Sequence, residues 1–437
     1  MTEEPNPAAG EELEEAPHAE PAGYAPSVAE RLAFYQRAGG IITPVITTIF
    51  AFFMAGIVVA ATGHNPIRVY RAIFDGTGFN WFFRFGHYHI DIPFTHHHVF
   101  FWWNTSIIAN APYNLTQTLI LTTTLILTGL AVSFAFRCGL FNIGGQGQYF
   151  AGSITGVYIG SRFVGMASWA HILLAIVLAS LAGAAWAAIA GLLKATVGAH
   201  EVITTIMLNW IVIWGGQYLF AIGGPLQNHV DKSIPRSDDV VRNAHLPVWW
   251  GNPNLQGLHI GFFIAVAMLV VFWLVLNRTT VGYQVRAVGF NPDAARYGGI
   301  GVARNYVLAM AISGLFAGLA GVIDILGWAF RIDVLDFQVS NVGFIGIAVA
   351  LLGRNTAVGV GLAGLLFGAL IEGASTRNPG LSSLVDPRLA GNLTLIIQAL
   401  VLLFIGADVL ILYIWQARKK LGLVRRAEPS AAGEPAT

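Results

Sequence analysis

The stretch Arg286-Ala-Val-Gly-Phe-Asn-Pro-Asp-Ala-Ala-Arg-Tyr-Gly-Gly-Ile300 is a polar island between long apolar runs, and it signals both ends of a helix. Asn291 is a residue type that caps helix N-termini, and Pro292 fits the first helical position, where its missing N–H costs nothing. Asp293 places a negative charge where the helix dipole favours it. The Gly298–Gly299 pair predicts a left-handed C-cap. A helix of about two turns is unstable alone in water, so we expect a partner protein at a membrane face to support it.

The composition places the chain in lipid. Hydrophobic residues make up 55% of the sequence and charged residues 11%, against about 25% charged residues in soluble domains. No block of basic residues interleaved with aromatics indicates nucleic-acid binding, and the single Cys138 excludes an intrachain disulfide. The polar ends, residues 1–37 and 418–437, are expected to be cytoplasmic tails, and the acidic start argues against a cleavable signal peptide.

The apolar stretches predict an all-α polytopic membrane protein in which residues 38–417 form about ten transmembrane or partly spanning helices, judged against the ~20 residues that a bilayer demands. These stretches are 41–61, 114–136, 148–163, 169–193, 202–222, 259–276, 305–326, 340–352, 356–374 and 392–413. Two of them, 148–163 and 340–352, are too short for a full crossing. Short segments in matching places of two halves point to a central substrate path, and the order of spans is compatible with an inverted repeat.

Basic residues in short loops set the orientation. With both termini in the cytoplasm, the cytoplasmic loops hold Arg137, Lys194, Arg278, Arg286, Arg296, Arg304, Arg354 and the Arg418-Lys419-Lys420 cluster. Residues 277–304 are then a cytoplasmic loop, and residues 223–256 are an extracytoplasmic loop that could help dock another protein.

Small residues at four-residue spacing predict close helix packing. They are Gly152, Gly156 and Gly160, then Gly183, Ala187 and Gly191, and finally Gly314 with Gly318. The run Phe141-Asn-Ile-Gly-Gly-Gln-Gly-Gln148 should resist helix and leave backbone groups free at membrane depth, which is tolerated only against protein or water. Asn142, Gln146 and Gln148 could then bind a polar solute. An ordinary cytoplasmic turn is the alternative.

Four stretches in one order resemble permease subunits of bacterial ABC importers of the branched-chain amino acid and simple-sugar group, closest to the nucleoside-type branch. They are 125–148, 200–210, 286–300 and 343–355. The resemblance covers roughly residues 41–407 and implies a multi-pass protein of the bacterial inner membrane. The sequence differs from the family's pattern at three positions. Gln146 and Ile345 stand where the family usually has acids, and Asp324 is one methylene shorter than the acid that is usual at its position.

The resemblance implies that the polar island is a coupling helix that docks on an ATPase subunit, with Asn291, Pro292, Ala294, Ala295 and Arg296 on its pattern beside Asp293. It also implies a second permease, identical or homologous, and an extracytoplasmic solute-binding protein. No G-x-x-x-x-G-K-[ST] phosphate loop occurs in the chain, so ATP–Mg is expected on the partner and no cofactor in this chain. Ala295→Asp is expected to leave membrane insertion intact and abolish ATP-dependent uptake.

Acids within the spans are functional candidates by default. Asp324 and Glu372 lie near outer ends of their spans and could reach interfacial water, whereas Glu201 could pair with Lys194. The insertion at 79–103 holds several histidines and Asp91. Its spacing does not favour a metal site, so we expect an interfacial aromatic belt and no metal.

Two other functions compete with an ABC permease. A secondary transporter would need more intramembrane charge, and a membrane-embedded enzyme would need clustered His, Asp or Glu. We therefore expect a transport subunit without enzymatic activity of its own, moving a nucleoside or related solute. A simple sugar and a branched-chain amino acid are the alternatives. The expected hydrogen-bonding residues of the path are Asn142, Gln146, Gln148, Asp324 and Asn341.

Overall fold

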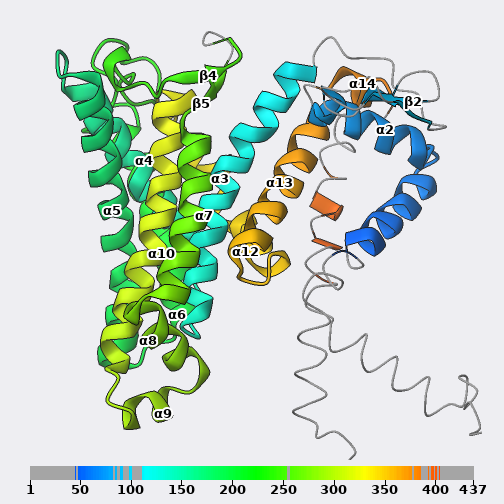
Figure 1. Ribbon diagram of the computed structural model, residues 1–437. Coiled ribbons are helices and arrows are strands. Elements are labelled where there is room, and N and C mark those ends of the chain that lie inside the picture. Colours follow the sequence, from blue (N-terminus) through cyan, green and yellow to red (C-terminus); the bar gives the residue numbers. More distant parts are fainter. Residues whose placement is uncertain are drawn as a thin grey trace, which may run out of the picture. The chain divides into compact units, whose positions relative to one another are not determined.

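The computed structural model describes residues 48–81, 84–85, 89–91, 98–100, 111–252, 256–375 and 378–384, together with residue 45 and isolated positions between 392 and 403. Both predicted tails lie outside the described residues, as do the histidine side chains of the 79–103 insertion and most of the predicted last span. The described part is mostly helical (Figure 1).

In the described part of the chain, five helical segments are long and apolar enough to cross a membrane, in agreement with the predicted helical membrane protein. They are α3 (Ala111–Arg137), α5 (Ser168–Val197), α6 (Glu201–Phe220), α7 (Gly261–Arg278) and α10 (Val302–Asp324) with its π-helical extension η4 (Ile325–Ala329). The helix Thr48–Ala61 and α2 (Pro66–Thr77) meet at a bend of 120° and would make a sixth span if counted together.

Of the two segments predicted to be short, 340–352 is short in the structure, where it forms α12 (Val342–Leu352) with 11 residues. The other, 148–163, belongs to α4 (Gly145–Arg162), which has 18 residues and is as long as α7. Helix α13 (Ala357–Gly373) follows α12. The remaining helical elements are α8 (Thr280–Phe290), α9 (Pro292–Tyr297), α11 (Asp336–Val339), α14 (Pro379–Ser382), η1 (Phe79–Trp81) and η2 (Arg242–Ala244).

Two small antiparallel sheets add strands to the helical fold. The first contains β1 (Arg84–Phe85), β2 (His89–Asp91) and β3 (His98–Phe100), in that order, with Ile90 opposite both Phe85 and Val99. The second pairs β4 (Val248–Trp250) with β5 (Leu258–His259). The sequence analysis gave no strand, because segments of two or three residues are too short for a readable alternation.

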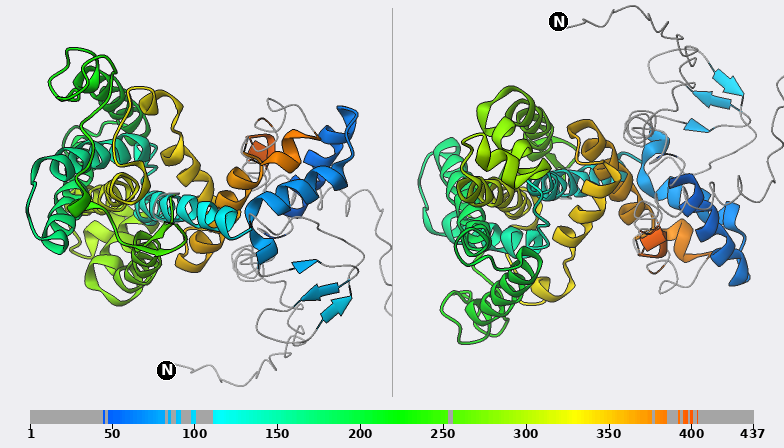
Figure 2. Two further views of the ribbon diagram at one scale, coloured as in Figure 1. Left: turned by 90° about the horizontal axis from the view of Figure 1, so that it is seen from above. Right: turned by 90° about the horizontal axis from the view of Figure 1, so that it is seen from below.

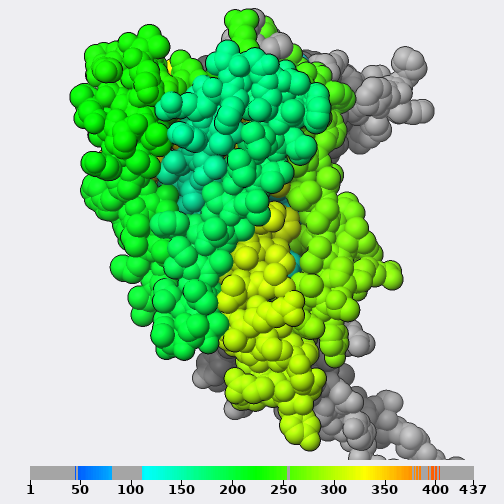
Figure 3. Space-filling view, turned by 90° about the vertical axis from the view of Figure 1, so that its left-hand side faces the viewer, coloured from blue at the N-terminus to red at the C-terminus, as the bar shows by residue number. Residues whose placement is uncertain are grey.

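Helix α10 lies at the centre of the packing, in contact with α3, α4 and α5. A Cβ placed on Gly152 would lie 2.3 Å from the carbonyl oxygen of Gly318, and one on Gly183 would lie 2.5 Å from that of Gly314. Only glycine allows backbones to approach this closely, so the predicted small-residue faces are confirmed as packing faces. Figure 3 shows α10 reaching the surface between α5 and the α7–α8 segment.

The two ends of the bundle differ. Helices α8 and α9 lie at one end, and β4 and β5 lie at the opposite end (Figure 1). Seen from above and below, α3 lies between the α4–α10 bundle and the helices α2 and α13 (Figure 2), and it contacts both groups. The predicted polar helix and the predicted outer loop are therefore at opposite ends.

Candidate functional site

A buried carboxylate marks the candidate solute site. Asp324, at the end of α10, is only 2% exposed. Its Oδ1 accepts hydrogen bonds from Thr124 Oγ1 at 2.5 Å and from Trp328 Nε1 at 3.1 Å, and its Oδ2 accepts one from Tyr149 Oη at 2.8 Å. The sequence suggested that this side chain could reach interfacial water, but in the structure it is buried. Three donors from α3, α4 and η4 stabilise it instead.

This carboxylate lines a cavity of about 370 Å³, a volume within the range of small-molecule sites. Aromatic side chains and further charged groups share the wall with Asp324. They include Tyr149, Phe150, Trp328, Arg331, Asp333 and Asp336, and Ser340 and Gln256 also line the cavity. Since Gln256 comes from the segment that joins β4 to β5, the cavity lies toward the end of the bundle away from α9.

A change of helix type shapes one wall of the cavity. Helix α10 continues as η4, which ends at Phe330 with a φ of 56°. On the side of η4 away from the cavity, a Cβ at Gly327 would lie 2.4 Å from the ring of buried His259, so the packing of η4 has room only for glycine there. Single π-helical turns are frequent at functional sites, and this one places Trp328 against Asp324.

The glycine-rich run after α3 enters the bundle. Asn142 donates to Ser313 Oγ at 2.7 Å and to Gln148 Oε1 at 2.9 Å, and all three side chains are buried. Ser313 lies eleven residues after Val302 in α10, about 16 Å along the helix. The segment is therefore buried in protein well inside the bundle, rather than an ordinary cytoplasmic turn.

The glycines of this run do not resist helix, contrary to the prediction. Helix α4 begins at Gly145 and includes Gly147. Asn209 in α6 holds its start, because its Oδ1 accepts from the backbone N–H of Gly147 at 2.8 Å and its Nδ2 donates to the carbonyl of Ile143 at 3.0 Å. Tertiary hydrogen bonds thus override the weak helix propensity of glycine.

Asn209→Ala should lower the free energy of unfolding by about 2–4 kcal/mol, since it removes the partner of the buried Gly147 N–H and of the half-buried Ile143 carbonyl. Thermal unfolding in detergent measures the effect. Thr204→Ala, on the same helix but with only local hydrogen bonds, is the matched control. Equal midpoints for the two variants would contradict this role of Asn209.

Gln146 joins α4 to α12. Its Nε2 donates to the carbonyl of Ser340 at 2.8 Å, and its Oε1 accepts from the backbone N–H of Gly343 at 2.7 Å. An ionised glutamate could accept from Gly343 but could not donate to Ser340. This geometry gives a physical reason for glutamine at the position where the resembled family usually has an acid.

The other predicted residues lie in separate places. Asn341 is exposed and its side chain does not cap α12. Glu372 is buried at 3% exposure, and Glu201 pairs with Lys194 at 2.9 Å, which was one of its two predicted roles. Among the described residues no group of three or more His, Cys, Asp or Glu could hold a metal.

Helix α9 has the predicted start. The Asn291 Oδ1 accepts from the backbone N–H groups of Asp293 and Ala294, both at 3.0 Å, and Pro292 occupies the first turn. The C-terminal prediction was half correct: Gly299 is left-handed with a φ of 80°, but Gly298 is not, with a φ of −75°.

One of the docking residues predicted for α9 does not face outward. Ala295 is 6% exposed and lies against the rest of the chain, whereas Ala294 and Arg296 are exposed. Two aromatic side chains that border the helix are almost fully exposed, Phe290 at 91% and Tyr297 at 97%. Sequence reasoning missed both, although an aromatic residue in a polar island is a visible signal for a contact surface.

The comparisons with known proteins identify the chain. Residues 114–406 match the family described as branched-chain amino acid transport system, permease component. The chain belongs to this permease family. Among its relatives is the guanosine ABC transporter permease protein NupP of Bacillus subtilis (strain 168), 39% identical over 71% of this chain and 86% of the relative.

Two further relatives are named for nucleoside and for glucose transport. The nucleoside ABC transporter permease protein NupB of Lactococcus lactis subsp. cremoris (strain MG1363) is 32% identical, over 78% of this chain and 85% of the relative. The glucose ABC transporter permease protein TsgB13 of Haloferax volcanii (strain ATCC 29605) is 31% identical, over 83% and 86%. No solved structure matches the chain. The protein is therefore an ABC transporter permease subunit and an integral membrane protein.

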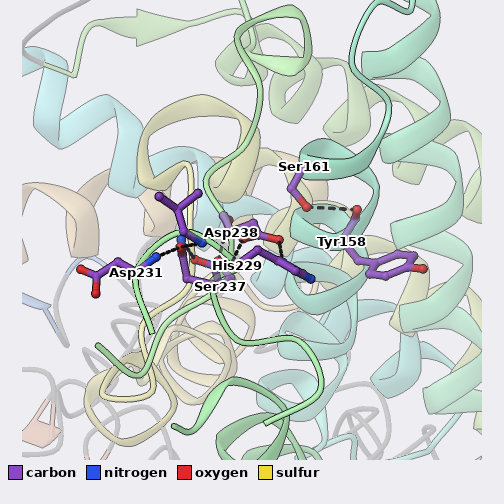
Figure 4. Close-up of polar contacts among 8 residues, drawn as sticks. Tyr158, Ser161, His229, Asp231, Ser237 and Asp238 are labelled. Carbon is purple, nitrogen blue, oxygen red and sulfur yellow. Dashed lines mark hydrogen bonds and ion pairs between the residues drawn. The ribbon is translucent and has the colours of Figure 1, made fainter. Parts of the chain in front are cut away.

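At the opposite end from α9, the permease presents an ordered polar loop (Figure 4). His229 donates its backbone N–H to Asp238 Oδ1 at 2.8 Å, and its Nδ1 lies 2.6 Å from Asp238 Oδ2. The hydroxyl and backbone N–H of Ser233 hold the pKa of Asp231 below its ordinary value. Val230 is 95% exposed beside them, so this loop offers both polar and apolar contacts.

Proposed function

We propose that this permease is the membrane-spanning subunit of an ATP-driven importer that moves a nucleoside or related purine-like solute across the bacterial inner membrane. The single observation that carries the substrate class is the buried Asp324 carboxylate in an aromatic cavity. The guanosine and nucleoside relatives support the same class. A simple sugar is the second candidate, because the glucose permease is also similar.

The hydrogen-bond inventory of Asp324 favours a solute that donates. A carboxylate has about four lone-pair sites on its two oxygens. Two donors already occupy Oδ1, while Oδ2 has only Tyr149. Oδ2 therefore keeps one acceptor site for a solute N–H or ribose O–H. Trp328, which is half-buried and lines the cavity, provides a surface for stacking, and such stacking is worth about 1–3 kcal/mol per nucleobase.

Asp324→Asn should reduce uptake of guanosine about 10-fold to 100-fold, because the amide replaces an acceptor by a donor among three fixed donors. Competition by unlabelled guanosine, glucose and leucine, measured in vesicles containing the complete transporter, separates the substrate classes. Asp75→Asn, in α2 and outside the cavity, is the control. Unchanged guanosine uptake in Asp324→Asn would contradict the site, and competition by glucose alone would favour the sugar reading.

The wider assembly belongs to the same proposal. A second permease, an ATPase subunit that binds ATP–Mg, and a solute-binding protein would complete the importer. The exposed α9 surface supports the ATPase contact, and the outer loop at 223–256 supports the contact with the binding protein. We also propose about ten spans with both termini in the cytoplasm, because the basic residues of the short loops then lie on the cytoplasmic side. An inverted repeat of the spans is part of the same proposal.

The remaining path residues are proposed for hydrogen bonding and alignment. Asn142 and Gln148 would act deeper than the cavity, since they pair near Ser313 rather than near Asp324. Gln146 would act through Ser340, whose carbonyl it holds and which lines the cavity. Asn341 follows Ser340 directly and is proposed to contact solute only after a change of conformation.

A further inference from the structure

A second cavity, of about 340 Å³, lies at the end of the bundle that carries α8 and α9. Its wall combines the end of α3 at Arg137, the end of α7 near Trp273, helix α8 at Arg286, and the α12–α13 loop at Asn355. None of these residues contributes to the cavity around Asp324. The cavity is therefore a separate feature of the fold.

Two arginines give this cavity a positive wall. Arg137 donates from Nε and Nη2 to the carbonyl of Asn355, at 3.0 and 2.8 Å. Arg286 donates from Nε to the carbonyl of Gly282. An arginine has five N–H donors, so both Nη groups of Arg286 and part of Arg137 keep unused donors. Within the described part of the chain neither guanidinium has a carboxylate within 4.0 Å.

The rest of the wall is apolar and partly open to the surroundings. Phe272 and Leu276 are buried, while Trp273 is 44% exposed and Val358 is 74% exposed. Arg278 lies over the Trp273 ring, 5.5 Å from its centroid. A tryptophan with neighbouring arginines at the end of a spanning helix is typical of the membrane–water boundary.

We propose that this cavity binds the phosphate headgroup of an anionic phospholipid from the cytoplasmic leaflet, in the orientation proposed above. The arginine fork matches a phosphate in geometry as well as in charge. The apolar rim at Trp273 and Val358 accommodates the start of an acyl chain, which a free phosphate lacks. Basic pockets between spanning helices on the cytoplasmic side are suited to such headgroups.

The proposed lipid site lies beside the segments that support α9. Arg137 holds the α12–α13 loop through Asn355, and both Arg354 and Asn355 in that loop have positive φ angles, 50° and 53°. Arg286 belongs to α8, which leads directly into α9. A bound headgroup would neutralise two adjacent cations and stabilise the base on which α9 rests.

Native mass spectrometry of the full chain, extracted from vesicles with equal phosphatidylglycerol and phosphatidylcholine, tests the proposal. We expect the wild type to retain phosphatidylglycerol and Arg286→Gln to retain about five- to tenfold less. The reason is that each cation contributes about 1 kcal/mol or more to binding of an anionic lipid. Arg304→Gln removes an exposed arginine outside the cavity and should retain the lipid. Val358→Trp, which fills the rim without changing either arginine, should also lower retention.

Equal retention of both lipids, or unchanged phosphatidylglycerol in Arg286→Gln and Val358→Trp, would overturn the proposal. Displacement of phosphatidylglycerol by millimolar inorganic phosphate would assign the cavity to a soluble anion and would overturn the lipid assignment. The readout is lipid retention and needs neither solute nor ATPase. Its failure is therefore distinguishable from failure of the proposed transport function.

Discussion

Tyr297→Ala is expected to abolish co-purification with the ATPase subunit and ATP-dependent uptake, while the permease still inserts into the membrane. Tyr297 is 97% exposed at the end of α9, and Phe290 is 91% exposed just before it. Aromatic residues dominate the energetics of protein interfaces, and truncation of such a residue costs about 2 kcal/mol or more, or about 30-fold in affinity. A helix of six residues has little else with which to bind a partner.

Tyr218→Ala is the matched control for this experiment. Tyr218 is also strongly exposed, at 70%, but it lies near the far end of α6. We expect it to retain the ATPase subunit and to transport normally. Normal uptake by Tyr297→Ala, or loss of membrane insertion in that variant, would count against a docking role. Ala295→Asp is a poorer test, because Ala295 is buried and an aspartate there would disturb the packing of α9 against the rest of the chain as well as its contact surface.

Gly318→Leu should prevent the bundle from assembling. A Cβ on Gly318 would already lie 2.7 Å from the carbonyl oxygen of Ala179 and 3.0 Å from the Cα of Gly183. Both neighbours are backbone atoms of α5, so they cannot move aside without separating α5 from α10. Overpacking of this kind costs about 3 kcal/mol or more. Size-exclusion profiles and thermal unfolding in detergent would show aggregated or strongly destabilised protein.

Gly215→Leu provides the control, because a Cβ on Gly215 in α6 has no atom within 4 Å among the described residues. This substitution should leave the unfolding midpoint close to that of the wild type. A folded Gly318→Leu variant of similar stability would show that α10 does not pack against α5 as closely as the structure has it.

Much of the helical fold could be predicted because apolar length and capping residues are local signals. The expected span 114–136 corresponds to α3 and the expected span 169–193 to α5. Helix α2 was missed, although Asn65 and Pro66 repeat the start signal of Asn291 and Pro292. Helix α8 was missed because its charged and glycine residues were assigned to a loop.

The site could be predicted only in part, because its groups come from distant parts of the chain. Asp324 was a candidate as an intramembrane acid. Its partners Thr124 and Tyr149 are 200 and 175 residues away in sequence, and no local pattern brings them together. The side of α9 that faces outward was also not predictable, since it depends on how α8 and α10 orient the helix.

We propose that ATP hydrolysis on a separate subunit, transmitted through α9, drives a nucleoside through this permease. The most direct measurement is guanosine uptake into vesicles that contain the permease, its partner permease, the ATPase subunit and the binding protein, with no ion gradient. We expect uptake that needs ATP and stops when the ATPase subunit is omitted. Uptake driven by an ion gradient in the absence of that subunit would show that this mechanism is wrong.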